Sequence, residues 1–191
     1  MRIFVALFVP DAVRDAVVAA MDTLRKPGDA VSWVKPENLH YTLRFMGELG
    51  EDGTRRVGEA AHEAASRHAP FELALGGLGC FPPKGVPRVL WVGASKGAEA
   101  LEAYARDLEQ GLRGHGFDRA DHPFRAHLTI GRVRDSRAGP ALAPSRDWRV
   151  ALASVAVQAP AFRVERIAVV HSQLSPKGSI YTVLREASLG A

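Results

Sequence analysis

The chain has 191 residues, of which 47% are hydrophobic, with a net charge of +4 and one cysteine, Cys80. This length suffices for one sizeable domain, and we expect a single two-lobed domain over residues 1–191. One cysteine excludes an intrachain disulfide, and no apolar run reaches the roughly 20 residues of a membrane span. We therefore expect a cytoplasmic, monomeric protein that needs neither a membrane nor an obligate protein partner.

The positive charge allows two interpretations. A basic balance suits an anionic partner such as nucleic acid. An ordinary solvated surface in an arginine-rich chain explains the charge equally well. The residue pattern must therefore decide the function.

The apolar periodicities and the Gly and Pro positions divide the chain into alternating strands, helices and turns. The expected segments, in chain order, are a strand at Arg2–Val9, a helix at Asp11–Leu24, a strand at Val31–Val34, a turn at Pro36–Asn38, a strand at Leu39–Met46, a loop at Gly47–Gly53, a helix at Thr54–His68, a strand at Phe71–Gly79, a loop at Cys80–Pro87, a strand at Arg88–Ala94, a helix at Ala98–Leu112, a strand at Ala126–Val133, a loop at Arg134–Ser145, a short helix within Asp147–Val157, a strand at Phe162–Leu174, a turn at Ser175–Gly178 and a strand at Ser179–Glu186.

Several neighbouring strands have short connections, which favours an α+β fold with antiparallel sheets over a doubly wound parallel sheet. One short phrase also occurs twice, as His40-Tyr41-Thr42-Leu43 and as His127-Leu128-Thr129-Ile130. Each copy follows a helix through a turn that contains proline. A duplicated lobe with pseudo-two-fold symmetry would explain this spacing.

Both copies of the phrase lie in strand-like apolar runs. Residues i and i+2 of a strand share a face, so His40 lies beside Thr42, and His127 beside Thr129. An imidazole takes or gives a proton near neutral pH, and a pair can act as base and acid on opposite sides of one reacting centre. Threonine hydroxyls beside them can donate to phosphate oxygens. The pair therefore favours hydrolysis of a phosphate ester, for which a cyclic ribose phosphate is a suitable substrate.

Three other uses of these residues stay open from the pattern alone. A single His-x-Thr in a strand is usually structural. Histidines also bind metals, although no carboxylate or cysteine stands at ligand spacing beside either copy, and we expect no metal and no cofactor. An RNA-binding module without catalysis is the third use, and it lacks the aromatic strand pattern expected of an RNA-recognition sheet.

The two histidine segments resemble a known family. The stretches Trp33–Gly47 and Pro123–Val133 are similar to the two signatures of the RNA 2′,3′-cyclic phosphodiesterases, formerly called 2′-5′ RNA ligases, of the 2H phosphoesterase superfamily. Further similarity lies at Arg2–Ala6, Gly76–Gly79, Pro87–Trp91 and Ser172–Leu174, and at Gly178 and Tyr181.

The resemblance implies a bilobal fold, with two pseudo-symmetric lobes of antiparallel sheet, helices outside and a positively charged cleft between them. It also implies metal-independent hydrolysis of RNA 2′,3′-cyclic phosphate ends to 2′-phosphates. His40 is then the proton donor and His127 the proton acceptor, while Thr42 and Thr129 hold the phosphate. Some family members also join 2′,3′-cyclic and 5′-hydroxyl ends reversibly. A smaller cyclic nucleotide is an alternative substrate.

Two arginines are further candidates for substrate binding. In a regular strand Arg44 shares the face of His40 and Thr42, and Phe45 faces the core. Arg132 would lie opposite Thr129 if its strand stays regular, yet it can reach phosphate from the strand end. Trp33 and Tyr181 can stack on a base, although core packing is the more common role of such residues.

Overall fold

The computed structural model describes residues 1–134, 146–176 and 178–190, so most of the loop expected at Arg134–Ser145 lies outside the described residues. Alternating apolar residues form the strands, and apolar residues at helical spacing form the helices that cover them. The elements, in chain order, are β1 (Arg2–Phe8), α1 (Asp11–Leu24), β2 (Val31–Trp33), a 3₁₀ turn (Pro36–Asn38), β3 (His40–Glu48), α2 (Glu51–Ala65), β4 (Phe71–Phe81), β5 (Val89–Lys96), α3 (Ala98–Gly114), β6 (Leu128–Val133), α4 (Trp148–Ala153), β7 (Phe162–Val164), β8 (Arg166–Ser175) and β9 (Gly178–Ser188).

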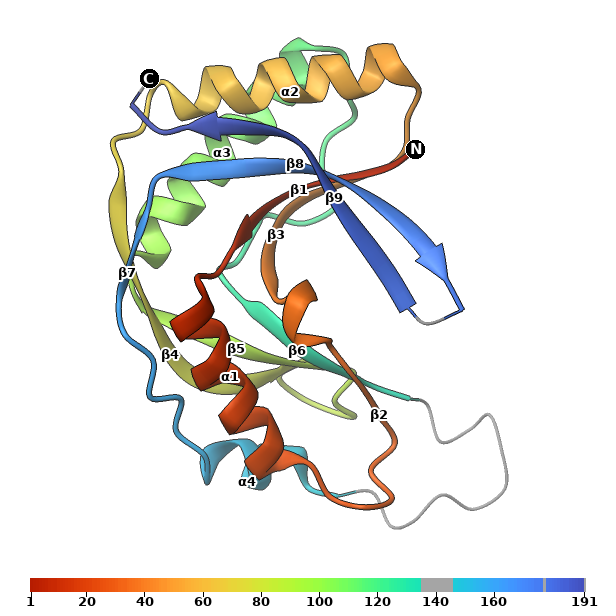
Figure 1. The fold of residues 1–191 in the computed structure, drawn as a ribbon, viewed down its shortest axis with the longest axis vertical. Helices are drawn as coiled ribbons and strands as arrows, with labels where there is room; N and C mark the ends of the chain where they lie inside the picture. Colours follow the sequence, from red (N-terminus) through yellow and green to blue (C-terminus); the bar gives the residue numbers. More distant parts are fainter. Residues whose placement is uncertain (135–145, 177, 191) are drawn as a thin grey trace.

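The described strands form one strongly curled antiparallel sheet (Figure 1). Its order is β7-β4-β5-β6-β3-β1-β8-β9, with β2 added on β6. The two halves meet at β3 and β6, which pair through Tyr41 and Leu128, the residues that follow the two histidines. Outward from this contact, β3 and β1 correspond to β6 and β5. The prediction of an α+β fold with two pseudo-symmetric antiparallel lobes is confirmed.

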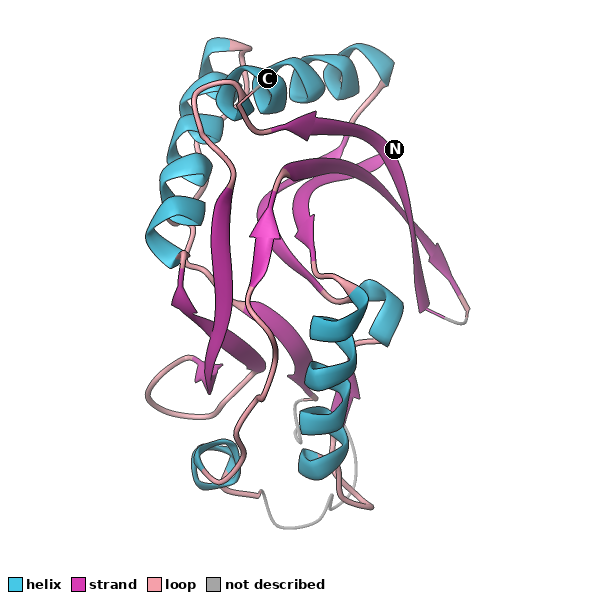
Figure 2. Ribbon diagram, turned by 60° about the vertical axis from the view of Figure 1, so that its left-hand side comes forward, coloured by secondary structure: helices cyan, strands magenta, loops and turns pink. Residues whose placement is uncertain are grey.

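The helices lie outside the curled sheet (Figure 2). Helices α2 and α3 pack together, and α2 also contacts β8 and β9. The apolar stripe of α1, which includes Val13, Val17 and Met21, is fully buried in the main core. On the inner side of the sheet a separate small cluster contains Phe4, Ala6 and Val170. The sheet therefore has a thick apolar core on its helix side and a thinner apolar layer on its inner side.

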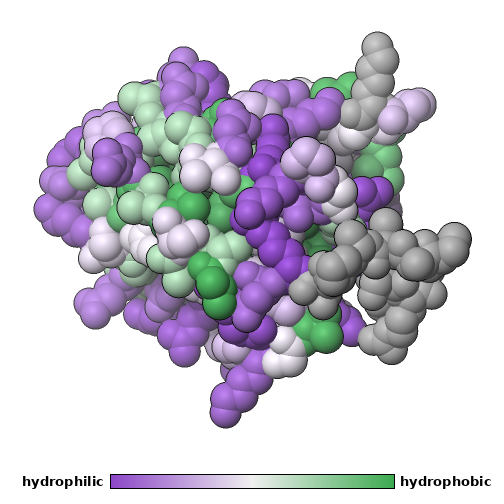
Figure 3. All heavy atoms as spheres, turned by 90° about the horizontal axis from the view of Figure 1, so that it is seen from below, coloured by the Kyte–Doolittle hydropathy of each residue, from purple (hydrophilic) through white to green (hydrophobic). Residues whose placement is uncertain are grey.

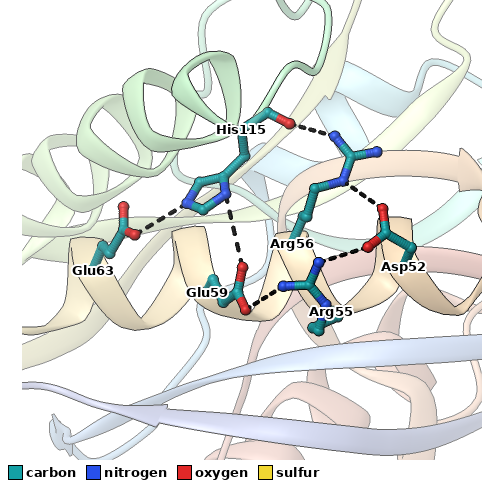
Figure 4. A network of polar contacts seen from close by, with 6 residues as sticks. All are labelled: Asp52, Arg55, Arg56, Glu59, Glu63 and His115. Carbon is teal, nitrogen blue, oxygen red and sulfur yellow. Dashed lines mark hydrogen bonds and ion pairs between the residues drawn. The ribbon is translucent and has the colours of Figure 1, made fainter.

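A polar network also joins α2 to the end of α3 (Figure 4). The His115 ring lies 3.0 Å from Glu63 and 3.9 Å from Glu59. Arg56 donates to the main-chain carbonyl of His115 and pairs with Asp52 at 3.0 Å. These contacts give His115 a structural role behind the sheet.

Some boundaries differ from those expected. Helix α2 begins at Glu51 and not at Thr54, since the acidic residues Glu51 and Asp52 favour the positive end of the helix dipole. Strand β4 continues to Phe81, two residues into the expected loop. The strand expected at Phe162–Leu174 is wrong as one element.

That segment forms two strands in different lobes. Strand β7 ends at Val164 and pairs with β4, whereas β8 begins at Arg166 and pairs with β1 and β9. Only Glu165 lies between them, and the sequence marks the crossing from one lobe to the other by no more than two successive polar residues, Glu165 and Arg166. The expected turn at Ser175–Gly178 is confirmed, because Ser175 and Gly178 end the pairing of β8 with β9.

None of the described helices combines the length and apolar composition that a bilayer span needs. Seen from the end that carries α1 and α4, the surface shows apolar areas among hydrophilic ones (Figure 3).

The turn before α3 contains Gly97, whose backbone conformation and close approach to β4 can be tested by substitution. Gly97 has φ +77°, and a Cβ there would lie 2.2 Å from the carbonyl oxygen of Glu72. Gly28 has φ +87° with nothing within 4 Å of such a Cβ. Gly97→Ala should therefore lower the free energy of unfolding by about 1–3 kcal/mol more than Gly28→Ala does. Urea denaturation measures both, and equal losses would contradict the close approach of β4.

Candidate active site

His40 begins β3, and one residue, Leu39, separates it from the 3₁₀ turn. Its Nδ1–H donates to the main-chain carbonyl of Asn38 at 2.7 Å. The Oγ1 of Thr42, two residues along the strand, lies 2.9 Å from Nε2. Since Nδ1 carries the proton in the neutral ring, Nε2 accepts from the Thr42 hydroxyl and is the nitrogen left for proton transfer.

His127 repeats this arrangement in the other lobe. Its Nδ1–H donates to the main-chain carbonyl of Arg125, also two residues earlier and also at 2.7 Å. The residue immediately precedes β6, which begins at Leu128, so the strand expected from Ala126 starts two residues later. Both lobes thus fix the same imidazole tautomer, with Nε2 as the basic atom.

The two histidines line one cavity of about 570 Å³. The predicted pairs His40 with Thr42 and His127 with Thr129 are all in its wall, as the shared-face argument requires. The lining residues are Arg2, Phe4, Val34, Asn38, His40, Thr42, Phe45, His127, Thr129, Arg132, Ser172, Leu174, Ser179 and Tyr181. The cavity therefore brings two imidazoles, several hydroxyls and two guanidinium groups together.

Aromatic rings surround each imidazole. The His40 ring lies 5.0 Å from the Phe4 ring and 5.3 Å from the Tyr181 ring, the latter edge to face. The His127 ring lies 5.2 Å from Phe81, also edge to face. Rings at these distances hold the imidazoles in place and exclude water from their faces.

This environment keeps both imidazoles neutral. Burial is the main cause that lowers the pKa of His40 below 6.5, and the charge of Arg132 lowers it further, against the opposing hydrogen bond to Asn38. Burial and Arg132 lower the pKa of His127 in the same way, against the bond to Arg125. Both rings are therefore mostly uncharged at pH 7 in the free protein.

A matching β-bulge follows each His-x-Thr phrase. In β3, Thr42 pairs with Ala6 but Arg44 pairs with Val5, so Leu43 is an extra residue. In β6, Thr129 pairs with Trp91 but Gly131 pairs with Leu90, so Ile130 is an extra residue. A bulge shifts the alternation of faces by one position.

The bulges overturn the expected orientation of three side chains. Arg132 and Phe45 line the cavity, whereas regular strands would place Arg132 opposite Thr129 and Phe45 in the core. The expectation that Arg44 shares the face of His40 is wrong. Its guanidinium lies on the helix side, with Nε 3.2 Å from Glu109 and a hydrogen bond of 2.7 Å to the carbonyl of Asp118.

Other residues also differ from the sequence-based roles. Tyr181 lines the cavity, while Trp33 packs edge to face on Trp148 at 6.0 Å. Asn38, which no sequence signal singled out, is buried and donates its side-chain amide to the carbonyl of Ser179 at 2.9 Å. This bond joins the turn before His40 to the β8–β9 hairpin. Within the described residues, no three His, Cys, Asp or Glu side chains converge in a way that could hold a metal ion.

Comparison with known proteins places the chain. The model of the 2′-5′ RNA ligase superfamily matches residues 9–175. The RNA 2′,3′-cyclic phosphodiesterase of Archaeoglobus fulgidus is 37% identical over 185 residues, which cover 97% of this chain and 98% of that protein. The Thermus thermophilus protein of the same name is 37% identical over 196 residues, covering 99% and 90%.

Solved structures have the same fold as this chain. The crystal structure of TT0787 from Thermus thermophilus has a TM-score of 0.82 at 34% identity and covers 100% of this chain and 98% of its own. The apo structure of Escherichia coli LigT, at 23% identity, shows the same fold with a TM-score of 0.73 over 100% of this chain and 98% of its own. Together the relatives and the fold define a hydrolase of the phosphodiesterase class. The chain belongs to the 2′-5′ RNA ligase superfamily.

Proposed function

We propose that this protein hydrolyses RNA 2′,3′-cyclic phosphate ends to 2′-phosphates, with His40 as proton donor and His127 as proton acceptor, in one two-lobed domain. The observation that carries the proposal is the matched pair of imidazoles in one cavity, each with its Nδ1–H on a main-chain carbonyl. Relatives that align over nearly the whole chain carry the name of this activity. The substrate is RNA, and the reaction needs no metal.

In this mechanism His127 Nε2 takes a proton from water, and the resulting hydroxide oxygen attacks phosphorus. The bond from phosphorus to the ribose 3′ oxygen breaks, and His40 gives its Nε2 proton to that oxygen. The product is a 2′-phosphate with a free 3′-hydroxyl. His127 ends protonated and His40 neutral, and exchange with solvent resets the pair.

The bound phosphate favours the protonated form of His40, which its role as the acid requires. An anion beside an imidazole favours its protonated form, so a bound cyclic phosphate raises the pKa of His40 from its lowered value. Arg132, Thr42 and Thr129 then donate to the non-bridging phosphate oxygens, where charge accumulates during attack. Arg132 thus adds to the effect of burial in lowering the pKa of both free imidazoles, and it binds the anionic phosphate of the substrate. Arg44, committed to Glu109 and Asp118, takes no part.

Reversible ligation uses the same geometry. A 5′-hydroxyl in the position of the water gives up its proton to His127 and forms a 2′-5′ bond. His40 again protonates the departing 3′ oxygen.

Turnover of oligoribonucleotides that end in a 2′,3′-cyclic phosphate tests the proposal, with nucleoside 2′,3′-cyclic phosphates as short comparison substrates. We expect hydrolysis with a higher kcat/KM for the oligonucleotides. A preference for the mononucleotides would favour the small-cyclic-nucleotide alternative. Binding of RNA without any turnover would instead favour an RNA-binding module.

A further inference from the structure

The two imidazoles donate to main-chain carbonyls whose peptide groups are anchored differently. The Arg125 carbonyl, which accepts from His127 Nδ1–H at 2.7 Å, belongs to the same peptide group as the N–H of Ala126. That N–H donates to Oε1 of Glu102 on α3 at 3.1 Å. One peptide group therefore lies between a carboxylate and the His127 imidazole.

The corresponding peptide group in the other lobe is bound to a neutral acceptor. The Asn38 carbonyl accepts from His40 Nδ1–H at 2.7 Å. The N–H of the same peptide group is that of Leu39, and it donates to the carbonyl of Pro36 at 3.2 Å. The repeated motif thus gives two imidazoles of the same tautomer, one linked through a peptide group to a carbonyl and the other to a carboxylate.

The backbone that carries His127 lies outside the sheet. Residues 117–127 form neither helix nor strand, and the pairing of β5 with β6 begins at Leu128. His40, in contrast, pairs with Phe8 of β1. The direction of the His127 ring therefore depends more strongly on contacts outside the sheet.

Two carboxylates of α3 hold this irregular segment along the helix. Glu102 and Glu109 are seven residues apart, so they lie on the same side of α3. Glu109 accepts from the N–H of Ala120 at 2.7 Å, as Glu102 does from that of Ala126. The side chains are similarly buried, with 22% of Glu102 and 24% of Glu109 exposed. Glu109, whose bond lies further from the histidine, is therefore a matched control for Glu102.

The intervening peptide group transmits both orientation and charge. It is planar, with its N–H and C=O pointing in opposite directions, so a bond that holds the N–H also fixes the direction of the C=O. A carboxylate on the N–H polarises the group, because hydrogen bonds in a chain strengthen one another. The carbonyl is then a stronger acceptor for Nδ1–H, which favours the protonated imidazole. A general base reaches that state when it takes a proton from water.

We infer that Glu102 is a positioning residue which, through the Arg125–Ala126 peptide group, orients His127 and stabilises the proton that His127 accepts. The inference rests on the proposed function. Glu102 stays ionised throughout, since the proton passes from water to Nε2 of His127 and none crosses the peptide group. His40 has a neutral carbonyl in the equivalent place, which suits a group that must give up a proton. These hydrogen bonds thereby distinguish the base from the acid among two similar histidines.

The other groups that act on His127 lie on different parts of the chain. The rings of Phe81, at the end of β4, and Phe124 lie 5.2 and 6.5 Å from the imidazole. The charge of Arg132 on β6 opposes its protonation. Substitution of Glu102 keeps all three side chains, so a change in the titration of His127 reports the carboxylate.

Glu102→Gln and Glu102→Ala test the inference without turnover. Gln keeps an oxygen that accepts from the Ala126 N–H but carries no charge, whereas Ala removes the acceptor. NMR of the ring nitrogens in the free protein measures the tautomer and the pKa of each imidazole. We expect Glu102→Gln to keep the Nδ1–H tautomer of His127 with a pKa below that of wild type, and Glu102→Ala to give a mixture of tautomers. His40 should titrate as in wild type in both variants, and Glu109→Ala should change neither ring.

Turnover of a 2′,3′-cyclic phosphate gives the kinetic result. We expect Glu102→Ala to lower kcat about tenfold with KM little changed, and Glu102→Gln to restore part of the loss. Glu109→Ala should keep the kcat of wild type per folded molecule. In a His127→Ala background, Glu102→Ala should have no further effect, because the imidazole through which it acts is absent.

An unchanged titration of His127 in both Glu102 variants would overturn the inference. So would an equal loss of kcat in Glu102→Ala and Glu109→Ala, or a full additional loss in the double variant with His127→Ala. The NMR titration separates this inference from the proposed function. If wild type hydrolyses no cyclic phosphate, the proposed function fails, and the titration still decides whether Glu102 orients His127.

Discussion

His40→Ala and His127→Ala should each lower kcat for a 2′,3′-cyclic phosphate by about 10² to 10⁴, because each removes one proton-transfer group. The control is His62→Ala, since His62 is an exposed residue of α2 outside the cavity. Activity of either active-site variant close to that of wild type would contradict the paired mechanism.

The pH profiles of the same variants distinguish acid from base. Both free imidazoles have a pKa below 6.5, so the bell-shaped profile of kcat/KM for wild type should have its maximum below pH 6.5. His127→Ala should lose the fall on the acid side, because no base is left to protonate. His40→Ala should lose the fall on the alkaline side. If His40→Ala instead loses the fall on the acid side and His127→Ala the fall on the alkaline side, then His40 is the base and His127 is the acid.

Arg132→Gln should lower kcat/KM by about 10², the usual effect of removing one donor to a developing oxyanion. It should also shift the profile. The charge of Arg132 lowers the pKa of both imidazoles, so its removal raises both values and moves both limbs to higher pH.

Arg44→Gln is the matched control for this change. Its guanidinium lies on the helix side against Glu109, so the variant should affect stability more than activity per folded molecule. For both variants, kcat/KM is measured over a range of about 2 pH units on either side of the ordinary imidazole pKa. A profile of Arg132→Gln that does not move would contradict the position of its charge beside the histidines.

The repeated phrase was enough to predict the centre of the fold. Alternation in β3 and β6 places Tyr41 and Leu128 on the core side and Thr42 and Thr129 on the other, and the structure has them so. This succeeds because the pattern is short and lies before any irregularity. The pairing of Tyr41 with Leu128 also puts the two copies side by side, as a duplicated lobe requires.

Two features could not be predicted, for physical reasons. The bulges at Leu43 and Ile130 change the face of the residues that follow them, yet both extra residues are aliphatic and buried, as regular alternation also predicts for these two positions. Hydrophobicity therefore does not reveal them, and regular alternation places Arg44 on the wrong side. The crossing at Glu165 leaves only a short trace in the sequence, since Glu165 and Arg166 are the two exposed residues between buried Val164 and buried Ile167.

The most direct test of the central claim is the product formed from an oligoribonucleotide ending in a 2′,3′-cyclic phosphate, in excess EDTA. Wild type should convert it fully to the 2′-phosphate, whose phosphorus signal and resistance to a 3′-phosphatase identify it. A 3′-phosphate product would contradict the account, because the bond to the 2′ oxygen would then have broken. Loss of turnover on adding EDTA would also contradict it, because two histidines alone would then not perform the reaction.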